Sequence, residues 1–247
     1  PDLSRICGIA LNGDPENNSI DVRDYQTFWL GVKTNLKGYN PTAPDAVLPA
    51  LADISAYLYN DHNTDPLIKA ALVHYQFEMI HPFERYNGIV GRIIVPMVLR
   101  DTIGEAMPLI CLSEYLYHNK NEYFDLLRTT QYSGGYIRWI KFFVCAVGEA
   151  AKQSAKLLAQ YENDILWAEQ QIKENTLSSK SIWGVYNYLK RYPVSSISRA
   201  TEQTRFSFNS ISKAMQSLKE TGIVQETAAV RNRIWVHKKL IENLWYF

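Results

Sequence analysis

Residues 81–92 contain side chains whose types and spacing are suited to phosphate chemistry. His81 has an unperturbed pKa near ~6.5, which suits a general base at neutral pH. Asn87 and Gly88 come directly before an expected helix, whose free backbone N–H groups and dipole form an anion site. Arg92 follows about one turn later and can bind the same anion. A proton acceptor beside an anion site predicts phosphoryl or nucleotidyl transfer.

Each of these residues has a simpler interpretation when it is taken alone. A histidine before a proline is more often a core or surface residue, and Asn-Gly is more often an ordinary turn. The register of the whole segment argues against that interpretation. Its sequence is His81-Pro82-Phe83-Glu84-Arg85-Tyr86-Asn87-Gly88-Ile89-Val90-Gly91-Arg92, which resembles the Fic-family motif H-P-F-x-[D/E]-G-N-G-R-x-x-R. The positions that fit are His81, Pro82, Phe83, Asn87, Gly88 and Arg92.

Segments on both sides of the motif resemble the same family. Residues 39–41 and 71–80 lie before the motif, and residues 109–115, 121–124 and 139–143 lie after it. The resemblance covers roughly residues 25–175. On these residues the chain is identified as a member of the Fic (Fic/DOC) family.

The resemblance implies a mainly α fold, a Fic-type helical bundle that transfers AMP from ATP to a hydroxyl of a target protein. In that family the motif histidine deprotonates the hydroxyl, a role that would belong to His81. The residues implied at the nucleotide are Phe83, Asn87, Gly88, Arg92 and Tyr123. A small β-hairpin flap around residues 28–35 would pair with the target peptide by strand addition. The sequence does not identify that target.

Three motif positions depart from the family pattern. Arg85 stands where the pattern has the carboxylate that binds Mg²⁺, and arginine offers no ligand atom to a metal. Glu84 is one residue away and is expected to point elsewhere. Tyr86 replaces a loop glycine, and Ile89 replaces a phosphate-binding arginine. Alternatively, Arg85 lies against the phosphates and restores positive charge there, which would preserve nucleotide binding better than catalysis.

The sequence therefore predicts a nucleotide-binding protein whose adenylyltransferase activity is weak or absent. ATP is the expected ligand, and Mg²⁺ binding is doubtful. Whether the chain is an enzyme stays open at this point. The alternative is a non-catalytic, DNA-binding regulator whose Fic-like domain senses a nucleotide or a partner.

Helices must position these residues, because apolar side chains recur at helical spacing over most of the chain. Pro82 is expected to end one helix before the motif loop. The expected helices cover residues 46–58 (capped by Asp45), 67–80, 88–99, 121–130, 136–147 and 149–172. We divide the chain into an N-terminal segment with the flap (1–40), a Fic-like core (41–175) and a winged helix domain (176–247).

The C-terminal region is basic, although the net charge of the whole chain is only +1. Residues 178–247 contain 11 Lys and Arg against 4 Asp and Glu. Three helices and a hairpin, in that order, resemble a winged helix-turn-helix, with residues 207–219 as recognition helix. The expected DNA contacts are Asn209, Ser210 and Lys213 on that helix, and Arg231 and Arg233 on the hairpin. The alternative is a packing or dimer module, so a homodimer stays open.

Composition excludes several other classes of protein. No run approaches about 18 apolar residues, so neither a spanning helix nor a membrane partner is expected. The three cysteines (Cys7, Cys111 and Cys145) are widely spaced. That spacing argues against a disulfide framework or a zinc site, and it predicts buried thiols in the reducing cytoplasm.

Overall fold

The computed structural model describes residues 21–28, 39–104, 110–175, 179–227 and 233–245 of the chain. The chain divides into two compact units, Pro1–Ser154 and Ala155–Phe247. The expected boundary after residue 175 stays a prediction. The expected flap lies almost entirely in residues 29–38, which are outside the described residues.

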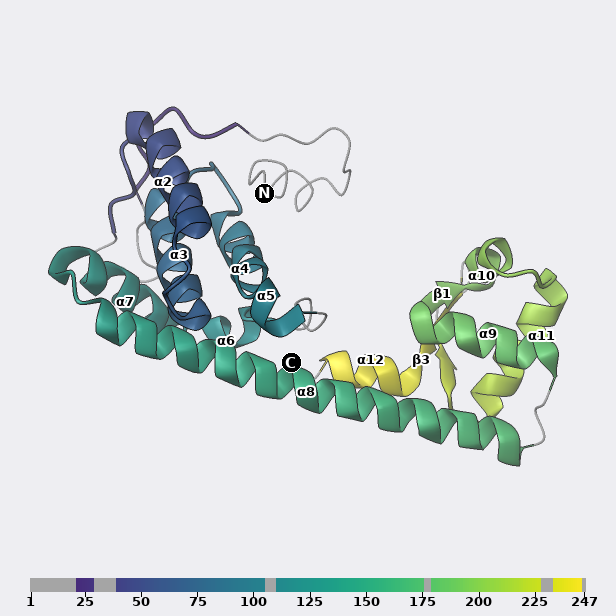
Figure 1. Ribbon diagram of the computed structural model, residues 1–247. Coiled ribbons are helices and arrows are strands. Elements are labelled where there is room, and N and C mark those ends of the chain that lie inside the picture. Colours follow the sequence, from purple (N-terminus) through teal and green to yellow (C-terminus); the bar gives the residue numbers. More distant parts are fainter. Residues whose placement is uncertain (1–20, 29–38, 105–109, 176–178, 228–232, 246–247) are drawn as a thin grey trace. The chain divides into compact units, whose positions relative to one another are not determined.

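Helices build the first unit (Figure 1). They are a short 3₁₀ turn η1 (Pro44–Ala46), α2 (Val47–Asn60), α3 (Pro66–Ile80), α4 (Asn87–Val98), α5 (Arg100–Ile103), α6 (Ser113–His118), α7 (Lys120–Ser133) and the first part of α8 (Tyr136–Glu174). The expected mainly helical class is confirmed. Residues 136–147 and 149–172, expected as two helices, belong to the single helix α8.

Helix α3 is the centre of this unit, because two buried apolar clusters pack against it. One buried cluster joins it to α7 and α8, and includes Leu127, Trp139 and Phe143. A second cluster joins it to α2 and α4, and includes Ile54 and Val90. Helix α3 therefore fixes the position of the loop that follows it.

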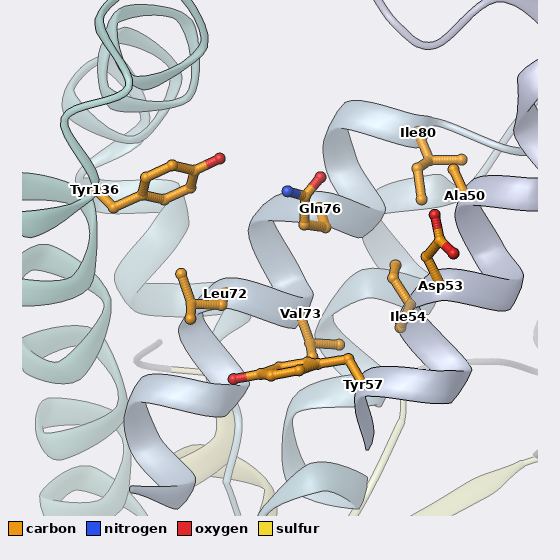
Figure 2. A pocket seen from close by; sticks show the side chains of 9 residues that line it. All are labelled: Ala50, Asp53, Ile54, Tyr57, Leu72, Val73, Gln76, Ile80 and Tyr136. Atoms are coloured by element: carbon orange, nitrogen blue, oxygen red, sulfur yellow. The ribbon is translucent and has the colours of Figure 1, made fainter. Parts of the chain in front are cut away.

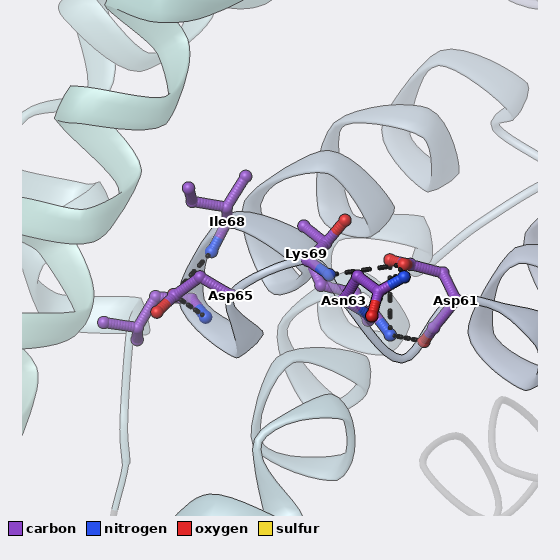
Figure 3. A network of polar contacts seen from close by, with 7 residues as sticks. Asp61, Asn63, Asp65, Ile68 and Lys69 are labelled. Carbon is purple, nitrogen blue, oxygen red and sulfur yellow. Dashed lines mark hydrogen bonds and ion pairs between the residues drawn. The ribbon is translucent and has the colours of Figure 1, made fainter.

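The start of α3 is held by a polar network (Figure 3). Asp65 caps the helix by accepting hydrogen bonds from the backbone N–H groups of Leu67 and Ile68. Asp61 accepts from the N–H of Asn63 at 3.1 Å, and its other carboxylate oxygen lies 3.5 Å from Lys69 Nζ. These contacts connect the end of α2 to the first turn of α3.

Two local expectations for this unit are wrong. Asp45 does not cap α2, because it lies inside the 3₁₀ turn that begins at Pro44. Cys111 and Cys145 are exposed free thiols rather than buried ones. Cys145 lies on the outer face of α8, since the helical period turns its neighbours Phe143 and Ala146 toward the core. Cys7 lies outside the described residues.

The second unit combines the rest of α8 with short helices and a small sheet. Its elements are α9 (Lys180–Arg191), β1 (Val194–Ser196), α10 (Ile197–Gln203), α11 (Phe208–Glu220), β2 (Val224–Glu226), β3 (Ile234–His237) and α12 (Lys238–Trp245). The strands form an antiparallel sheet in the order β1-β3-β2. Strand β1 was not expected, because three residues are too few to show an alternating pattern.

The expected hairpin is confirmed by the pairing of β2 with β3, in which Glu226 lies opposite Trp235. Ser207 caps α11 by accepting from Ser210 N–H, and Gly222 follows its end with a φ of +75°. The core of this unit contains Tyr186, Ile211 and Met215. In the part of the chain that the structure describes, no helix has the length and apolar character needed to cross a membrane.

Candidate functional site

His81 lies at the C-terminal end of α3, where its backbone leaves the helix. Its N–H still donates to Phe77 O at 3.0 Å, but its φ and ψ of 49° and 58° are left-handed. That conformation costs an ordinary L-residue about 1–2 kcal/mol. Pro82 follows, and it cannot donate a helical hydrogen bond. The chain is thus turned away from α3 at the residue that carries the candidate base.

The loop after His81 is closed by Asn87. Its side-chain Oδ1 accepts from Phe83 N–H at 2.9 Å, and its Nδ2 donates to Phe83 O at 2.7 Å. Asn87 is only 2% exposed, and Phe83 is buried in the cluster between α2, α3 and α4. The side chains of Asn87 and Phe83 therefore shape the loop. Their expected contacts with a nucleotide stay predictions.

The first turn of α4 offers backbone donors. Tyr86 O accepts from Ile89 N–H at 2.9 Å and from Val90 N–H at 3.2 Å. Among the described residues, no hydrogen bond uses the N–H of Asn87 or Gly88 as donor. Arg92 lies over this turn, since a Cβ on Gly88 would be 3.1 Å from Arg92 Nη1. A glycine at this position leaves room for the guanidinium beside the free N–H groups.

The imidazole of His81 is partly buried and neutral at pH 7. Burial is the main cause that lowers its pKa to about 4; the positive charge of Arg23 lowers it further, while the backbone carbonyl of Glu78 raises it. Tyr39 Oη lies 3.2 Å from His81 Nδ1. Burial raises the pKa of Tyr39, so its phenol keeps its proton. When Nδ1 carries the proton and donates to Tyr39, Nε2 is the nitrogen that can accept one.

A second histidine is buried beneath α4. His74 Nδ1 lies 2.9 Å from Gly91 O, so it donates, and His74 Nε2 accepts from Tyr123 Oη at 3.0 Å. Burial lowers the pKa of His74 to about 4 and raises that of Tyr123. Tyr123 is buried in the core. Its hydroxyl is thus committed to His74, and the expected place near the nucleotide base stays a prediction.

Glu78 is a buried carboxyl group on the same face of α3. It is 5% exposed, and among the described residues its Oε1 has no hydrogen-bond partner. Burial raises its pKa to about 7, whereas the charge of Arg92 acts to lower it. A Cβ on Gly91 would lie 2.4 Å from Glu78 Oε1. Gly91 therefore allows α4 to approach α3 closely over this carboxyl group.

The three departures from the motif lie on the outside of the loop or at the helix start. The side chains of Glu84 and Arg85 are 67% and 74% exposed, and Arg85 Nε is 3.9 Å from Glu84 Oε1. Tyr86 is exposed and has a φ of 67°, a value that a glycine adopts without strain. Ile89 is partly buried in the first turn of α4. In this conformation Arg85 extends into solvent.

Four groups of this site were missed by the sequence analysis, namely Arg23, Tyr39, His74 and Glu78. Glu78 and His74 had a usable signal, because each is a polar residue between apolar neighbours in α3. Arg23 had none, since it lies 58 residues before His81 and outside any motif.

Other hollows and clusters lie away from the motif loop. A cavity of about 350 Å³ lies between α2, α3 and Tyr136 at the start of α8, with Asp53 and Gln76 at its lining (Figure 2). A larger groove of about 890 Å³ lies between the end of α2, the start of α3 and the end of α4. Over the described residues, no group of three or more His, Cys, Asp or Glu side chains gathers in a way that could hold a metal.

A protein-family model described as "Fic/DOC family" matches residues 9–99. Protein adenylyltransferase fic-1 of Caenorhabditis briggsae is 38% identical to the chain over 64 residues, which is 25% of this chain and 12% of that protein. Probable protein adenylyltransferase aq_aa38 of Aquifex aeolicus (strain VF5) is 28% identical over 119 residues, which is 43% of this chain and 34% of that protein. The chain thus spans at most about a third of the length of these curated relatives.

The crystal structure of a Fic family protein from Desulfovibrio desulfuricans G20 has a similar fold. It aligns with 96% of this chain and 68% of its own chain, with a TM-score of 0.53. The sequence identity is 14%, so this likeness concerns the fold alone. It confirms the expected Fic-type helical architecture.

Proposed function

We propose that the chain, whose residues 9–99 match the Fic/DOC family model, binds the phosphates of a nucleotide, with weak or lost AMP transfer. One arrangement carries this proposal. The N–H groups of Asn87 and Gly88, which no described residue uses as hydrogen-bond donors, and the guanidinium of Arg92 lie side by side at the start of α4. Such donors, together with the helix dipole, bind phosphate oxygens through charge-assisted hydrogen bonds.

The residues of the site fit the phosphates of ATP better than they fit Mg²⁺. Magnesium is normally bound by one or two carboxylates together with phosphate oxygens. Arg85 offers no such ligand, and Glu84 is directed toward Arg85 in solvent. Glu78 is buried beside the positive charge of Arg92, which disfavours a second cation there. We therefore derive no step that uses a metal.

His81 is suited to accept the proton in any remaining transfer. The target hydroxyl would give its proton to the neutral imidazole while its oxygen bonds to the α-phosphorus of ATP. The bond from that phosphorus to the bridging oxygen would break, and pyrophosphate would leave. Removing a charge stabiliser of phosphoryl transfer lowers rates by about 10³ to 10⁵. The loss of the metal carboxylate and of the first motif arginine therefore argues for slow transfer or none.

Calorimetry with ATP, ADP and AMP, each with and without Mg²⁺, tests the binding proposal. We expect ATP to bind the unmodified chain, His81→Ala to keep that affinity, and Arg92→Met to weaken it about tenfold or more, because a charge-assisted hydrogen bond is lost. Arg100→Met removes an exposed arginine at the start of α5, two residues after α4, and serves as the matched control. Failure of all three nucleotides to bind would contradict the proposal.

Incubation with ATP labelled at the α-phosphate tests the transfer step. Label on the chain itself or on lysate proteins that disappears in His81→Ala would show an active adenylyltransferase. Binding without His81-dependent label would support the degenerate form.

A second candidate function is favoured by the surface of α11. The buried residues Ile211, Met215 and Leu218 lie on one face, whereas Asn209 and Lys213 are exposed on the other. The order of helices and strands in this unit supports a winged helix-turn-helix that inserts α11 into the major groove of DNA. Ser210 is partly buried and lies 3.0 Å from the hydroxyl of Ser207, so it is a weaker candidate for DNA contact.

The expected hairpin contacts have a smaller role in this proposal. Arg233 Nη1 lies 2.9 Å from Glu226 Oε1, and Lys219 Nζ lies 2.9 Å from the other oxygen. Arg233 is thus partly neutralised, although its side chain is 63% exposed. Arg231 lies outside the described residues.

Binding to a random DNA duplex at several salt concentrations tests this second function. We expect affinity to fall steeply with salt, and Lys213→Ala to reduce the slope of log K against log salt by about one. Lys156→Ala changes an exposed lysine on α8 and is the control. The absence of binding at low salt would leave the packing or dimer interpretation.

A further inference from the structure

Arg23 is a buried arginine whose hydrogen bonds surround the end of α3. It is 4% exposed. Its Nε donates to His81 O at 2.8 Å, and its Nη2 donates to Ile80 O at 3.0 Å and also to Thr42 O. Its Nη1 donates to Tyr25 O at 2.7 Å. Every nitrogen of the guanidinium therefore bonds to a backbone carbonyl.

The backbone of Arg23 adds a further bond to the motif loop, because its N–H donates to Pro82 O at 2.9 Å. Three consecutive carbonyls, those of Ile80, His81 and Pro82, are thus bound by one residue. The last carbonyls of a helix have no partner within the helix, and they carry the negative end of its dipole. A buried positive charge with planar, divergent donors matches these carbonyls in both charge and geometry.

We propose that Arg23 is the positioning residue of His81, holding the end of α3 and the left-handed backbone of His81 in the conformation that presents its imidazole to the site. This inference rests on the proposed role of His81 as proton acceptor. Without Arg23, the carbonyls of residues 80–82 would need water, and the left-handed turn would lose the contacts that hold it. Neither the motif nor the helix pattern contains this residue.

The surroundings of the imidazole support the assignment. The ring is approached by Arg23 from the segment 21–28, by Tyr39 Oη at Nδ1, and by the backbone carbonyl of Glu78 from α3. Thr42 N–H donates to Met79 O at 3.0 Å, which connects the segment of Tyr39 to α3. Burial is the main cause that lowers the pKa of His81 to about 4, and the charge of Arg23 is the second. Arg23 therefore affects both the place of the base and its protonation.

NMR titration of the histidine side chains tests the inference without any nucleotide. The His81 signal is assigned by its loss in His81→Ala. In the unmodified chain we expect His81 to stay neutral down to about pH 5. In Arg23→Gln, which removes the charge, its pKa should rise by at least one unit, a tenfold change in the protonation equilibrium. In Arg23→Lys, which keeps a charge but lacks the fork, it should rise by less.

Arg128→Met is the control, because it removes a half-buried arginine that pairs with Asp125 rather than with the loop. An unchanged His81 pKa in folded Arg23→Gln would overturn the inference. Should neither variant fold, the NMR spectrum of the unmodified chain decides. Guanidinium N–H protons of Arg23 that are protected from exchange with water support the inference, because they are the donors to the carbonyls of residues 80 and 81. Rapidly exchanging ones overturn it.

The outcome is separable from that of the proposed function. Failure of nucleotide binding would contradict the proposed function but would leave the titration result intact. If His81-dependent transfer is found, Arg23→Lys should lower kcat and leave the KM for ATP nearly unchanged, because Arg23 contacts only the backbone around His81.

Discussion

Both polar atoms of the Asn87 side chain are bonded to the backbone of Phe83. The residue types of the motif predict a phosphate contact for Asn87, which stays a prediction; the structure shows that its side chain closes the loop. Gly88 was predicted at the nucleotide as well, and the structure shows that its missing side chain makes room for Arg92. Sequence reasoning found these positions because the motif is local. It did not find their hydrogen-bond partners, because the same motif is compatible with several backbone conformations of the loop.

Asn87→Ala should destabilise the fold by about 2 kcal/mol or more. Two buried hydrogen bonds are lost, and the N–H and carbonyl of Phe83 are left without a partner in an apolar cluster. The free energy of unfolding measured in urea checks this. Asn119→Ala is the control, since its side chain makes one partly buried bond to Tyr115 O and should cost less than half as much. Equal losses would contradict the closing role of Asn87.

At the scale of elements, the packing of α4 on α3 creates the site. Helix α3 was predicted over 67–80 and is observed as Pro66–Ile80, because its apolar run and the proline that follows it are local signals. The sequence could not show that α4 crosses directly over Glu78 and His74. That contact depends on Gly91, which in the sequence is one glycine among 12.

Gly91→Ala should destabilise the chain by about 1–3 kcal/mol, because a methyl group would overlap Glu78 Oε1 and press on His74. Gly148→Ala is the matched control within α8, where nothing lies within 4 Å of the added Cβ. That variant should stabilise by about 0.5–1 kcal/mol through the better helix propensity of alanine. Thermal unfolding of both variants measures these changes. An unchanged stability of Gly91→Ala would show that α3 and α4 can move apart without destabilising the fold.

Glu78 should make stability depend on pH. Its pKa is raised from 4.5 to about 7 in the folded chain, so the folded state holds a proton that the unfolded state releases above pH 4.5. Its contribution is therefore fully present below about pH 4.5 and is lost as the pH rises to about 7. The full loss amounts to about 3 kcal/mol.

Glu78→Gln removes this titration. We expect the unfolding free energy of Glu78→Gln relative to the unmodified chain to increase between pH 5 and pH 8. The lowered pKa values of His74 and His81 act in the opposite direction, with stability rising between about pH 4 and 6.5, but they cancel in this difference. A difference between the two proteins that does not change with pH would show that Glu78 is ionised throughout.

At the scale of the whole molecule, the chain has two units with separate cores. The boundary predicted after residue 175 rested on a polar segment and a change in charge. Ala168 and Ile172 of α8 are fully buried in the core of the second unit, although they precede that boundary. Apolar periodicity predicted that this part of α8 buries one face. It could not predict which unit covers that face.

A fragment of residues 155–247 should fold cooperatively, whereas one of residues 176–247 should be less stable or unfolded. The shorter fragment loses the buried side chains of Ala168 and Ile172, and burial of an isoleucine alone contributes about 1.5–3 kcal/mol. Urea unfolding and amide NMR spectra of the two fragments check this. Equal stability would place the boundary at residue 175, as the sequence predicted.

The sequence by itself determined the register of residues 81–92, the ends of α3 and α4 to within one residue, and the absence of a carboxylate at position 85. These features depend on residues that are close together in the chain, so the sequence alone can predict them. The tertiary structure alone decided which groups surround His81. Arg23 and Tyr39 lie 58 and 42 residues before it, and Tyr123 lies 49 residues after His74. Contacts between residues so far apart leave no periodic pattern, because the fold rather than the local chain brings them together.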